Sequence, residues 1–187
     1  MIVRPIVLAS SSPRRQYLMK EAGFSFTVEK PNVDESFPPT LPIDQVAKYL
    51  AVKKAEYFRI GIKNEIIVTA DTVVILDQTI LNKPANRLEA INMLQNLSGK
   101  THLVMTGVCI LSAEKENSFD DTTEVTFKNL AQQEIEFYVD QYKPFDKAGA
   151  YGAQDFIGMI AIEKIVGSYF NVMGLPIHKV YAQLKTW

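Results

Sequence analysis

A mixed α/β fold is the architecture that this 187-residue sequence predicts. Short apolar runs of the length of buried strands alternate with longer segments whose apolar residues recur at helical spacing. Residues 102–113 and 118–130 are consecutive strand-rich segments with no helix between them, so we expect an antiparallel pair beside strands that helices connect. We therefore expect one domain over residues 1–187, with a mixed sheet split into two lobes around a central cleft. The hydrophobic fraction of 47% is sufficient for such a core.

The first strand and helix are predicted from the stretch "IVLASSSPRR". The apolar run at residues 6–9 is typical of a buried strand, and the serines that follow supply hydroxyl groups for a helix cap. Pro13 suits the first helical position, and Gly23 is a suitable end. Arg14 and Arg15 at a helix N-terminus oppose the helix dipole, whereas the free N–H groups there attract anions. This segment therefore predicts a bound anion.

The remaining elements follow from the same two periodicities. Residues 31–42 are rich in proline and are expected to form a loop. Strands are expected at about 25–29, 66–70, 73–76, 102–113, 118–130 and 160–165. Helices are expected at about 43–60, 87–97, 132–142 and 175–184.

Composition excludes several classes of protein. Twenty basic and 21 acidic residues give a formal net charge of −1, which argues against a general nucleic-acid binder. Cys109 is the only cysteine, so no internal disulfide can form and a reducing compartment is expected. No apolar run approaches the roughly 18 residues of a membrane span, and the first residues lack a signal-peptide pattern. We expect a cytoplasmic protein without a membrane partner. His102 and His178 lack the spacing of a zinc site.

Two acidic positions are candidates for chemistry. Asp71 interrupts the apolar run "IIVTADTVVIL", where a carboxylate is costly to bury unless it is paired or binds a metal. It is either a general base or metal ligand, or a turn residue between two strands. Glu35 lies in the proline-rich loop and is either a second metal ligand or a solvated loop residue. One or two carboxylates suffice for Mg²⁺, which retains waters and binds substrate phosphates.

Several cationic and polar residues are weak candidates one by one. Lys54 and Lys83 are ordinary surface lysines when taken alone, but together with Arg14 and Arg15 they can form a cationic receptor for a polyphosphate. Gln154 ends the small-residue stretch "DKAGAYGAQ". Its amide can either read a base edge through a donor and an acceptor, or belong to an ordinary glycine-containing loop.

Taken in order, these motifs resemble the Maf family of nucleoside triphosphate pyrophosphatases over almost the whole chain. The resemblance depends on several stretches, each weak alone and specific in this order: "LASSSPRR" (8–15), "VDE" (33–35), "LAVKKA" (50–55), "ADTVV" (70–74), "LNKP" (81–84), "LSGKTHLVMTG" (97–107), "DKAGAYGAQ" (146–154) and "GSYFNVMGLP" (167–176).

The resemblance implies a two-lobed fold like that of inosine triphosphate pyrophosphatases, with a central nucleotide cleft. It also implies a homodimer that converts a nucleoside triphosphate and water to a monophosphate and pyrophosphate with Mg²⁺ or Mn²⁺. The forms "DKAGAYGAQ" and "GSYFNV" are similar to the branch that acts on dTTP and UTP. By position, Asp71 matches the proton acceptor, and Glu35 matches a position at the phosphate and metal site. We expect Glu35 and Asp71 to hold the metal. The substrate-selecting positions are Arg14, Thr72 and Gln154, and those lining the phosphates are Ser10, Arg15, Lys54 and Lys83.

One stretch departs from the family pattern. In "LDQTILNKP" the residues Gln78 and Asn82 replace glycines, which concerns only the local shape of a turn because asparagine tolerates a left-handed backbone.

Two alternative functions stay open at this point. One is a pyrophosphatase for modified nucleotides, including a substrate of the 7-methyl-GTP type. The other is a non-catalytic protein that binds a division partner or single-stranded nucleic acid.

Overall fold

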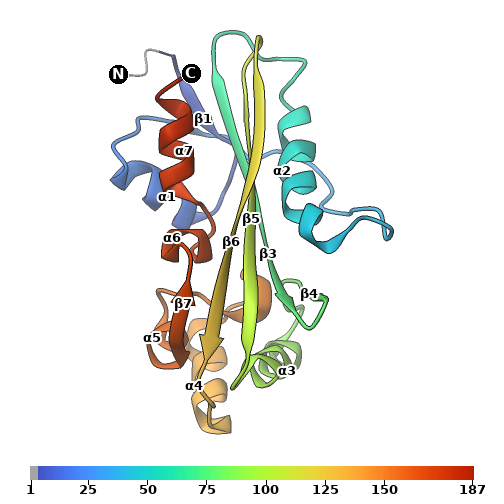
Figure 1. The fold of residues 1–187 in the computed structure, drawn as a ribbon, viewed down its shortest axis with the longest axis vertical. Helices are drawn as coiled ribbons and strands as arrows, with labels where there is room; N and C mark the ends of the chain where they lie inside the picture. The colour runs from blue at the N-terminus through green and yellow to red at the C-terminus, as the bar shows by residue number, and fades with distance from the viewer. Residues whose placement is uncertain (1–3) are drawn as a thin grey trace. The chain divides into compact units, whose positions relative to one another are not determined.

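The computed structural model describes residues 4–187 (Figure 1). These residues form seven strands and seven α-helices, with two short 3₁₀ helices at Ile43–Gln45 and Ala148–Ala150. The strands are β1 (Ile6–Leu8), β2 (Thr27–Val28), β3 (Ile66–Leu76), β4 (Thr79–Leu81), β5 (Thr101–Leu111), β6 (Glu116–Phe127) and β7 (Ile162–Val166). The helices are α1 (Pro13–Glu21), α2 (Val46–Glu56), α3 (Arg87–Leu97), α4 (Gln132–Tyr142), α5 (Phe156–Ala161), α6 (Tyr169–Val172) and α7 (Ile177–Leu184).

All seven strands belong to one mixed sheet. Its order is β2-β1-β3-β5-β6-β7, with β4 paired to β3. Strand β1 is parallel to both β2 and β3, and Val7 faces Thr27 on one side and Ile67 on the other. The pairs β3–β4 and β6–β7 are antiparallel. The predicted α/β class with a mixed sheet is therefore confirmed.

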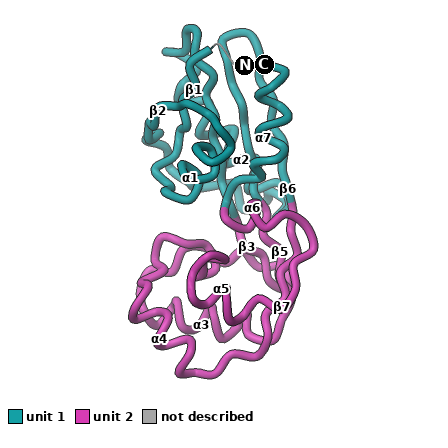
Figure 2. Tube along the Cα trace, turned by 90° about the vertical axis from the view of Figure 1, so that its left-hand side faces the viewer, with its two compact units in different colours: residues 1–72, 106–121, 174–187 teal, residues 73–105, 122–173 magenta. Residues whose placement is uncertain are grey.

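The chain divides into two compact units, coloured separately in Figure 2. Unit 1 contains the residues up to 72 together with 106–121 and 174–187, and unit 2 contains 73–105 and 122–173. The chain passes from one unit to the other within β3, β5 and β6. In unit 1, β1 and β3 pack against α2 through small and branched apolar residues, among them Val7, Ala51, Ala55 and Ile67.

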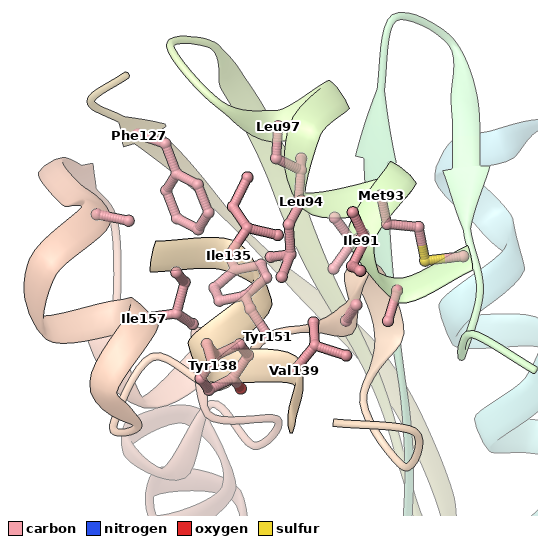
Figure 3. Packing of buried hydrophobic residues seen from close by; sticks show 14 of the residues in the cluster. Ile91, Met93, Leu94, Leu97, Phe127, Ile135, Tyr138, Val139, Tyr151 and Ile157 are labelled. Carbon is pink, nitrogen blue, oxygen red and sulfur yellow. The ribbon is translucent and has the colours of Figure 1, made fainter. Parts of the chain in front are cut away.

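The core of unit 2 is formed by long apolar side chains. Leu94 and Leu97 from α3, Ile135 from α4 and Ile157 from α5 point toward one another, as Figure 3 shows. Phe127 closes this cluster from the end of β6. Each of these five side chains is almost completely buried, which is the large apolar burial that stabilises a domain of this size.

Three parts of the predicted element order were wrong. Residues 66–76 form a single unbroken strand, although a break was expected around Asp71. The strand expected from residue 160 begins at Ile162, and α5 precedes it. The apolar run before it is too short for periodicity to distinguish a helix from a strand. Strand β4 was also missed; it follows a two-residue turn in which Asp77 and Gln78 both have a positive φ.

No helix in the described part of the chain combines the length and the apolarity needed to cross a bilayer.

The buried Cys109 lies in the core of unit 1, and burial raises the pKa of its thiol to about 12. A thiol in this state is a poor nucleophile, so Cys109 packs as a small apolar residue.

Candidate active site

The join between β1 and α1 carries the first group of predicted residues. Ser12 is the N-cap residue of α1 and Pro13 occupies the first turn, as the sequence indicated. The hydroxyl of Ser10 is buried and accepts a hydrogen bond from the backbone N–H of Ser12 at 3.3 Å. Arg14 lies half-buried at the start of α1, where no acidic residue occupies the first turn. The start of α1 therefore carries positive charge at the end of the helix where the dipole favours negative charge.

Arg15 is bound to the segment around Asp71. Its Nε donates to the carbonyl of Gly174 at 2.7 Å, and its Nη1 donates to the carbonyl of Ala70 at 2.9 Å. Nη1 also donates to the hydroxyl of Ser10 at 3.3 Å, and Nη2 donates to the hydroxyl of Thr72 at 3.0 Å. Four of the five N–H groups of a guanidinium are thus used within unit 1.

Burial and the neighbouring charges both shift the pKa of Arg15. Burial lowers the pKa of the Arg15 guanidinium from its ordinary value, and the neighbouring Arg14 lowers it further. The carboxylates of Asp71 and Glu35 act in the opposite direction and raise the pKa of Arg15. The charges of Arg14, Asp71 and Glu35 therefore all act on Arg15 in unit 1.

Thr72 is held from two sides. Its hydroxyl accepts the bond from Arg15 and forms a second hydrogen bond with the hydroxyl of Thr106 at 2.9 Å. Thr106 belongs to β5, the strand beside β3. Sequence reasoning missed both Thr106 and the carbonyl of Gly174, because a hydroxyl or a backbone oxygen far along the chain gives no local signal.

An ion cluster joins three of the predicted residues. The ammonium of Lys54, from α2, contacts Glu35 Oε1 at 2.8 Å and also forms an ion pair with Asp71 Oδ1. The side chains of Lys54 and Asp71 are 10% and 13% exposed, whereas that of Glu35 is 48% exposed. The paired ammonium explains how a carboxylate can lie in the middle of a strand, since burial is most costly for an uncompensated charge.

Gln154 lies in unit 2, where a different carboxylate orients its amide. Its Nε2 donates to Asp155 Oδ1 at 3.1 Å, while its Oε1 is buried without a hydrogen-bond partner. Asp155 also accepts a hydrogen bond from the hydroxyl of Tyr138 at 2.9 Å. The ammonium of Lys147 lies 3.6 Å from Asp155 Oδ2. Burial, and then the charge of Asp155, raise the pKa of Tyr138. Asp155 and Tyr138 were missed by the sequence analysis, although Asp155 directly follows the predicted residue.

Lys83, the last predicted residue, is exposed in unit 2, in the segment between β4 and α3. The structure thus brings Ser10, Arg15 and Thr72 together by hydrogen bonds and joins Glu35, Lys54 and Asp71 by ion pairs. Within the described residues, no group of three or more acidic, histidine or cysteine side chains is arranged to bind a metal ion. A metal at Glu35 and Asp71 would take its other ligands from water or substrate.

Comparison with known families identifies the family of the chain. The family model described as Maf-like protein matches residues 5–187. This chain belongs to the Maf-like family. The resemblance that the motifs indicated is therefore confirmed, and it covers both units of the chain.

Relatives of this Maf-like chain align over nearly their whole length. It is 47% identical over 182 residues to a dTTP/UTP pyrophosphatase of Phocaeicola vulgatus, covering 96% of this chain and 94% of the relative. A dTTP/UTP pyrophosphatase of Bacteroides fragilis is 48% identical with the same coverage. One from Porphyromonas gingivalis is 47% identical over 184 residues, covering 96% of this chain and 92% of the relative.

Solved structures agree with the Maf-like fold at low sequence identity. The Staphylococcus aureus Ham1 protein superposes with a TM-score of 0.57 at 16% identity, covering 98% of this chain and 99% of that protein. A HAM1 protein from Coxiella burnetii gives 0.54 at 13% identity, covering 99% and 100%. At these identities the likeness shows the fold alone.

Proposed function

We propose that this chain is a nucleoside triphosphate pyrophosphatase that hydrolyses dTTP and UTP to the monophosphate and pyrophosphate. The observation that carries the proposal is the ion cluster of Glu35, Lys54 and Asp71, which lies beside the arginines of α1. The cluster is found in a chain whose relatives are named dTTP/UTP pyrophosphatase at 44–48% identity. It combines an acceptor for the proton of a water molecule with cations for phosphate oxygens.

The reaction proceeds by attack of water on the α-phosphorus, with pyrophosphate as the leaving group. Asp71 accepts the proton of that water. Arg14, Ser10 and the N-terminus of α1 bind phosphate oxygens, because free N–H groups and a guanidinium both favour anions there. Lys54 neutralises charge on the leaving pyrophosphate, and Lys83 is proposed to do the same. Alignment and charge neutralisation provide most of the acceleration in such transfers.

Arg15 has a different role from Arg14 in this proposal. Four of its N–H groups already bind Ser10, Ala70, Thr72 and Gly174. We therefore assign Arg15 to positioning the Ala70–Thr72 segment, and with it Asp71, while its residual positive charge contributes to the phosphate site.

The donor set at Glu35 and Asp71 fits Mg²⁺ or Mn²⁺, because two carboxylates that share one cation offer hard oxygen ligands. When bound there, a divalent ion supplies positive charge to phosphate oxygens and lowers the pKa of a ligated water. Glu35 is the more exposed of the two and can move toward an incoming ligand, whereas Asp71 is fixed by its strand.

Recognition of the base is assigned to Gln154 and Thr72. The carboxylate of Asp155 accepts a hydrogen bond from the amide nitrogen of Gln154. The amide oxygen of Gln154 is therefore the group that can accept a hydrogen bond from the base. Uracil and thymine carry an N3–H donor, whereas cytosine has an acceptor at N3. This orientation favours the first two, because a mismatched base leaves polar groups unpaired.

The experiment is a panel of triphosphates with pyrophosphate and monophosphate as the measured products. We expect pyrophosphate release from dTTP and UTP that exceeds release from purine, 7-methyl-GTP and modified pyrimidine triphosphates. Asp71→Asn should lower kcat by at least about a hundred-fold, the scale of general-base removal, while nucleotide binding stays measurable. EDTA should stop turnover, and Mg²⁺ or Mn²⁺ should restore it.

Preference for a modified nucleotide would replace the proposed substrate, and no release from any triphosphate would favour the non-catalytic alternative. Full activity of Asp71→Asn would remove Asp71 as the base. A homodimer and a cytoplasmic location, both implied earlier, stay predictions.

A further inference from the structure

Lys54 occupies the place where the two proposed metal ligands meet. Its ammonium contacts Glu35 Oε1 at 2.8 Å and Asp71 Oδ1 at the same time. Lys54 and Asp71 are among the few charged residues of the described chain that are buried. The contact joins three separate segments of unit 1: the loop after β2, the helix α2 and the strand β3.

An ammonium and a divalent cation compete for the same carboxylate oxygens. The lone pairs of Glu35 Oε1 and Asp71 Oδ1 that point to Lys54 are not available to a metal ion in this arrangement. A metal held beside an unmoved Lys54 would also experience direct repulsion between like charges, which is strong in a partly buried site. Binding of the metal to these two oxygens therefore requires Lys54 to move.

The carboxylates of Glu35 and Asp71 alone supply too few ligands for a divalent metal ion. No cluster of three or more His, Cys, Asp or Glu side chains that could hold a metal ion is found among the described residues, so we expect water and phosphate oxygens to complete the coordination. A triphosphate provides such oxygens and also attracts the ammonium of Lys54. A lysine side chain has a flexible four-carbon stem, so it can change partners at small cost.

Resting on the proposed function, we propose that Lys54 is an exchangeable counter-ion. It blocks the divalent-metal site at Glu35 and Asp71 until a nucleotide triphosphate draws its ammonium to the phosphates. Metal and nucleotide then bind with positive coupling, and by linkage each raises the affinity for the other. Without nucleotide, the carboxylates stay neutralised and the chain binds divalent ions weakly.

The test measures Mn²⁺ binding to the full chain in the absence of nucleotide, from the loss of the electron paramagnetic resonance signal of free Mn²⁺. Lys54→Met should bind Mn²⁺ at least about ten-fold more tightly than the unmodified chain, within the usual range of coupling factors. Lys54→Arg retains the cation and should stay as weak as the unmodified chain. Adding Asp71→Asn to Lys54→Met should remove the gain.

Lys53→Met is the matched control. Lys53 is the adjacent residue of α2, and its ammonium contacts the carbonyl of Ser36 at 2.8 Å in the same loop as Glu35. The ammonium of Lys53 also lies 4.0 Å from Asp34 Oδ2, and it forms no part of the ion pairs of Glu35 and Asp71 with Lys54, so its removal should leave the Mn²⁺ affinity unchanged. Lys54→Gln, a polar replacement, provides the same comparison if circular dichroism shows that Lys54→Met does not fold.

A Lys54→Met or Lys54→Gln variant that folds and binds Mn²⁺ no more tightly than the unmodified chain overturns the inference, as does an equal gain in Lys53→Met. Failure here is distinct from failure of the proposed function, because the binding experiment contains no nucleotide. Hydrolysis of UTP by the unmodified chain, with no gain in Mn²⁺ affinity on removing Lys54, would reject the exchange alone.

Discussion

Arg15 contacts both neighbours of Asp71 and a carbonyl from a distant part of the chain. The bonds to Ala70 and Thr72 flank the carboxylate within β3, and the bond to Gly174 ties the same guanidinium to the segment before α7. At the scale of single residues, the position of Asp71 thus depends on two cations. Lys54 compensates its charge, and Arg15 holds the backbone that carries it.

Replacing Arg15 by lysine tests this role. Lysine keeps the charge but cannot reproduce the planar fork, so we expect Arg15→Lys to lower the free energy of unfolding by about 3 kcal/mol as buried carbonyls lose their donors. It should also reduce kcat more than it raises KM. Urea unfolding and UTP kinetics measure both effects.

Arg14→Lys is the comparison, because Arg14 is the adjacent arginine in the first turn of α1. It should change the free energy of unfolding by less than about 1 kcal/mol and act mainly on KM. Equal stability losses in the two variants would contradict the assignment of Arg15.

His102 makes the stability of the protein depend on pH. Its ring is buried, with Nε2 2.7 Å from the hydroxyl of Tyr151, and burial lowers the pKa of His102 from 6.5 to about 4. Between these two pKa values the unfolded chain takes up a proton that the folded chain does not. Stability is therefore lost as the pH falls below about 6.5 and the loss is complete near pH 4.

The expected loss between pH 7.5 and pH 5.0 is about 2 kcal/mol in the free energy of unfolding from this group alone. Urea unfolding at the two pH values measures it. In His102→Phe the drop should be smaller by that amount, because phenylalanine does not titrate. The same pH dependence in both proteins would show that His102 is not the responsible group.

At the scale of elements, α2 and β5 approach each other at a glycine. A Cβ atom at Gly107 would overlap the backbone carbonyl of Ala47 and the backbone nitrogen of Lys48. Lys54 lies two turns further along the same helix. The absence of a side chain at Gly107 thus helps to set where α2 presents Lys54 to Asp71.

Gly107→Ala should therefore displace α2. We expect the free energy of unfolding to fall by about 3 kcal/mol, the upper part of the range for overpacking, and UTP turnover to fall as Lys54 shifts. Thermal unfolding and the pyrophosphate assay measure the two effects. Gly61→Ala is the control, because nothing lies within 4 Å of a Cβ at Gly61. A Gly107→Ala protein as stable as the Gly61→Ala protein would contradict this account.

At the scale of the whole molecule, charge is nearly balanced but unevenly distributed. The chain carries 20 basic and 21 acidic residues, yet Arg14, Arg15 and Lys54 belong to one neighbourhood of unit 1. Many of the other charges are paired with one another, for example Arg87 with Asp140 and Lys179 with Asp121. A nucleotide tail needs only this local excess, whereas a nucleic-acid strand needs an extended one.

Binding of a labelled single-stranded oligonucleotide at about 150 mM salt distinguishes the two cases. We expect a dissociation constant weaker than about 100 µM, the weak end of non-specific binding, because few phosphates can be neutralised at once. Fluorescence anisotropy measures it. Micromolar affinity that falls steeply with added salt would instead favour the nucleic-acid-binding alternative.

Much of the architecture was determined by the sequence alone. The bounds of α3 and α4 were predicted to the residue, because each combines a clear apolar periodicity with recognisable ends. The mixed sheet followed from the order of the elements, and the family followed from the motifs. Asp71 was also apparent from its unusual position in an apolar run, whereas Lys54 alone was typical of an ordinary surface lysine.

Only the tertiary structure decided which partners these residues have. Asp71 was expected to break its strand, yet β3 continues through it because the ammonium of Lys54 arrives from another element. Arg15 and Gln154 were named from the sequence, but their bonds to Gly174 and Asp155 were not. Local patterns encode local conformation, whereas the compensation of a buried charge depends on which distant groups the packed core brings within hydrogen-bonding distance.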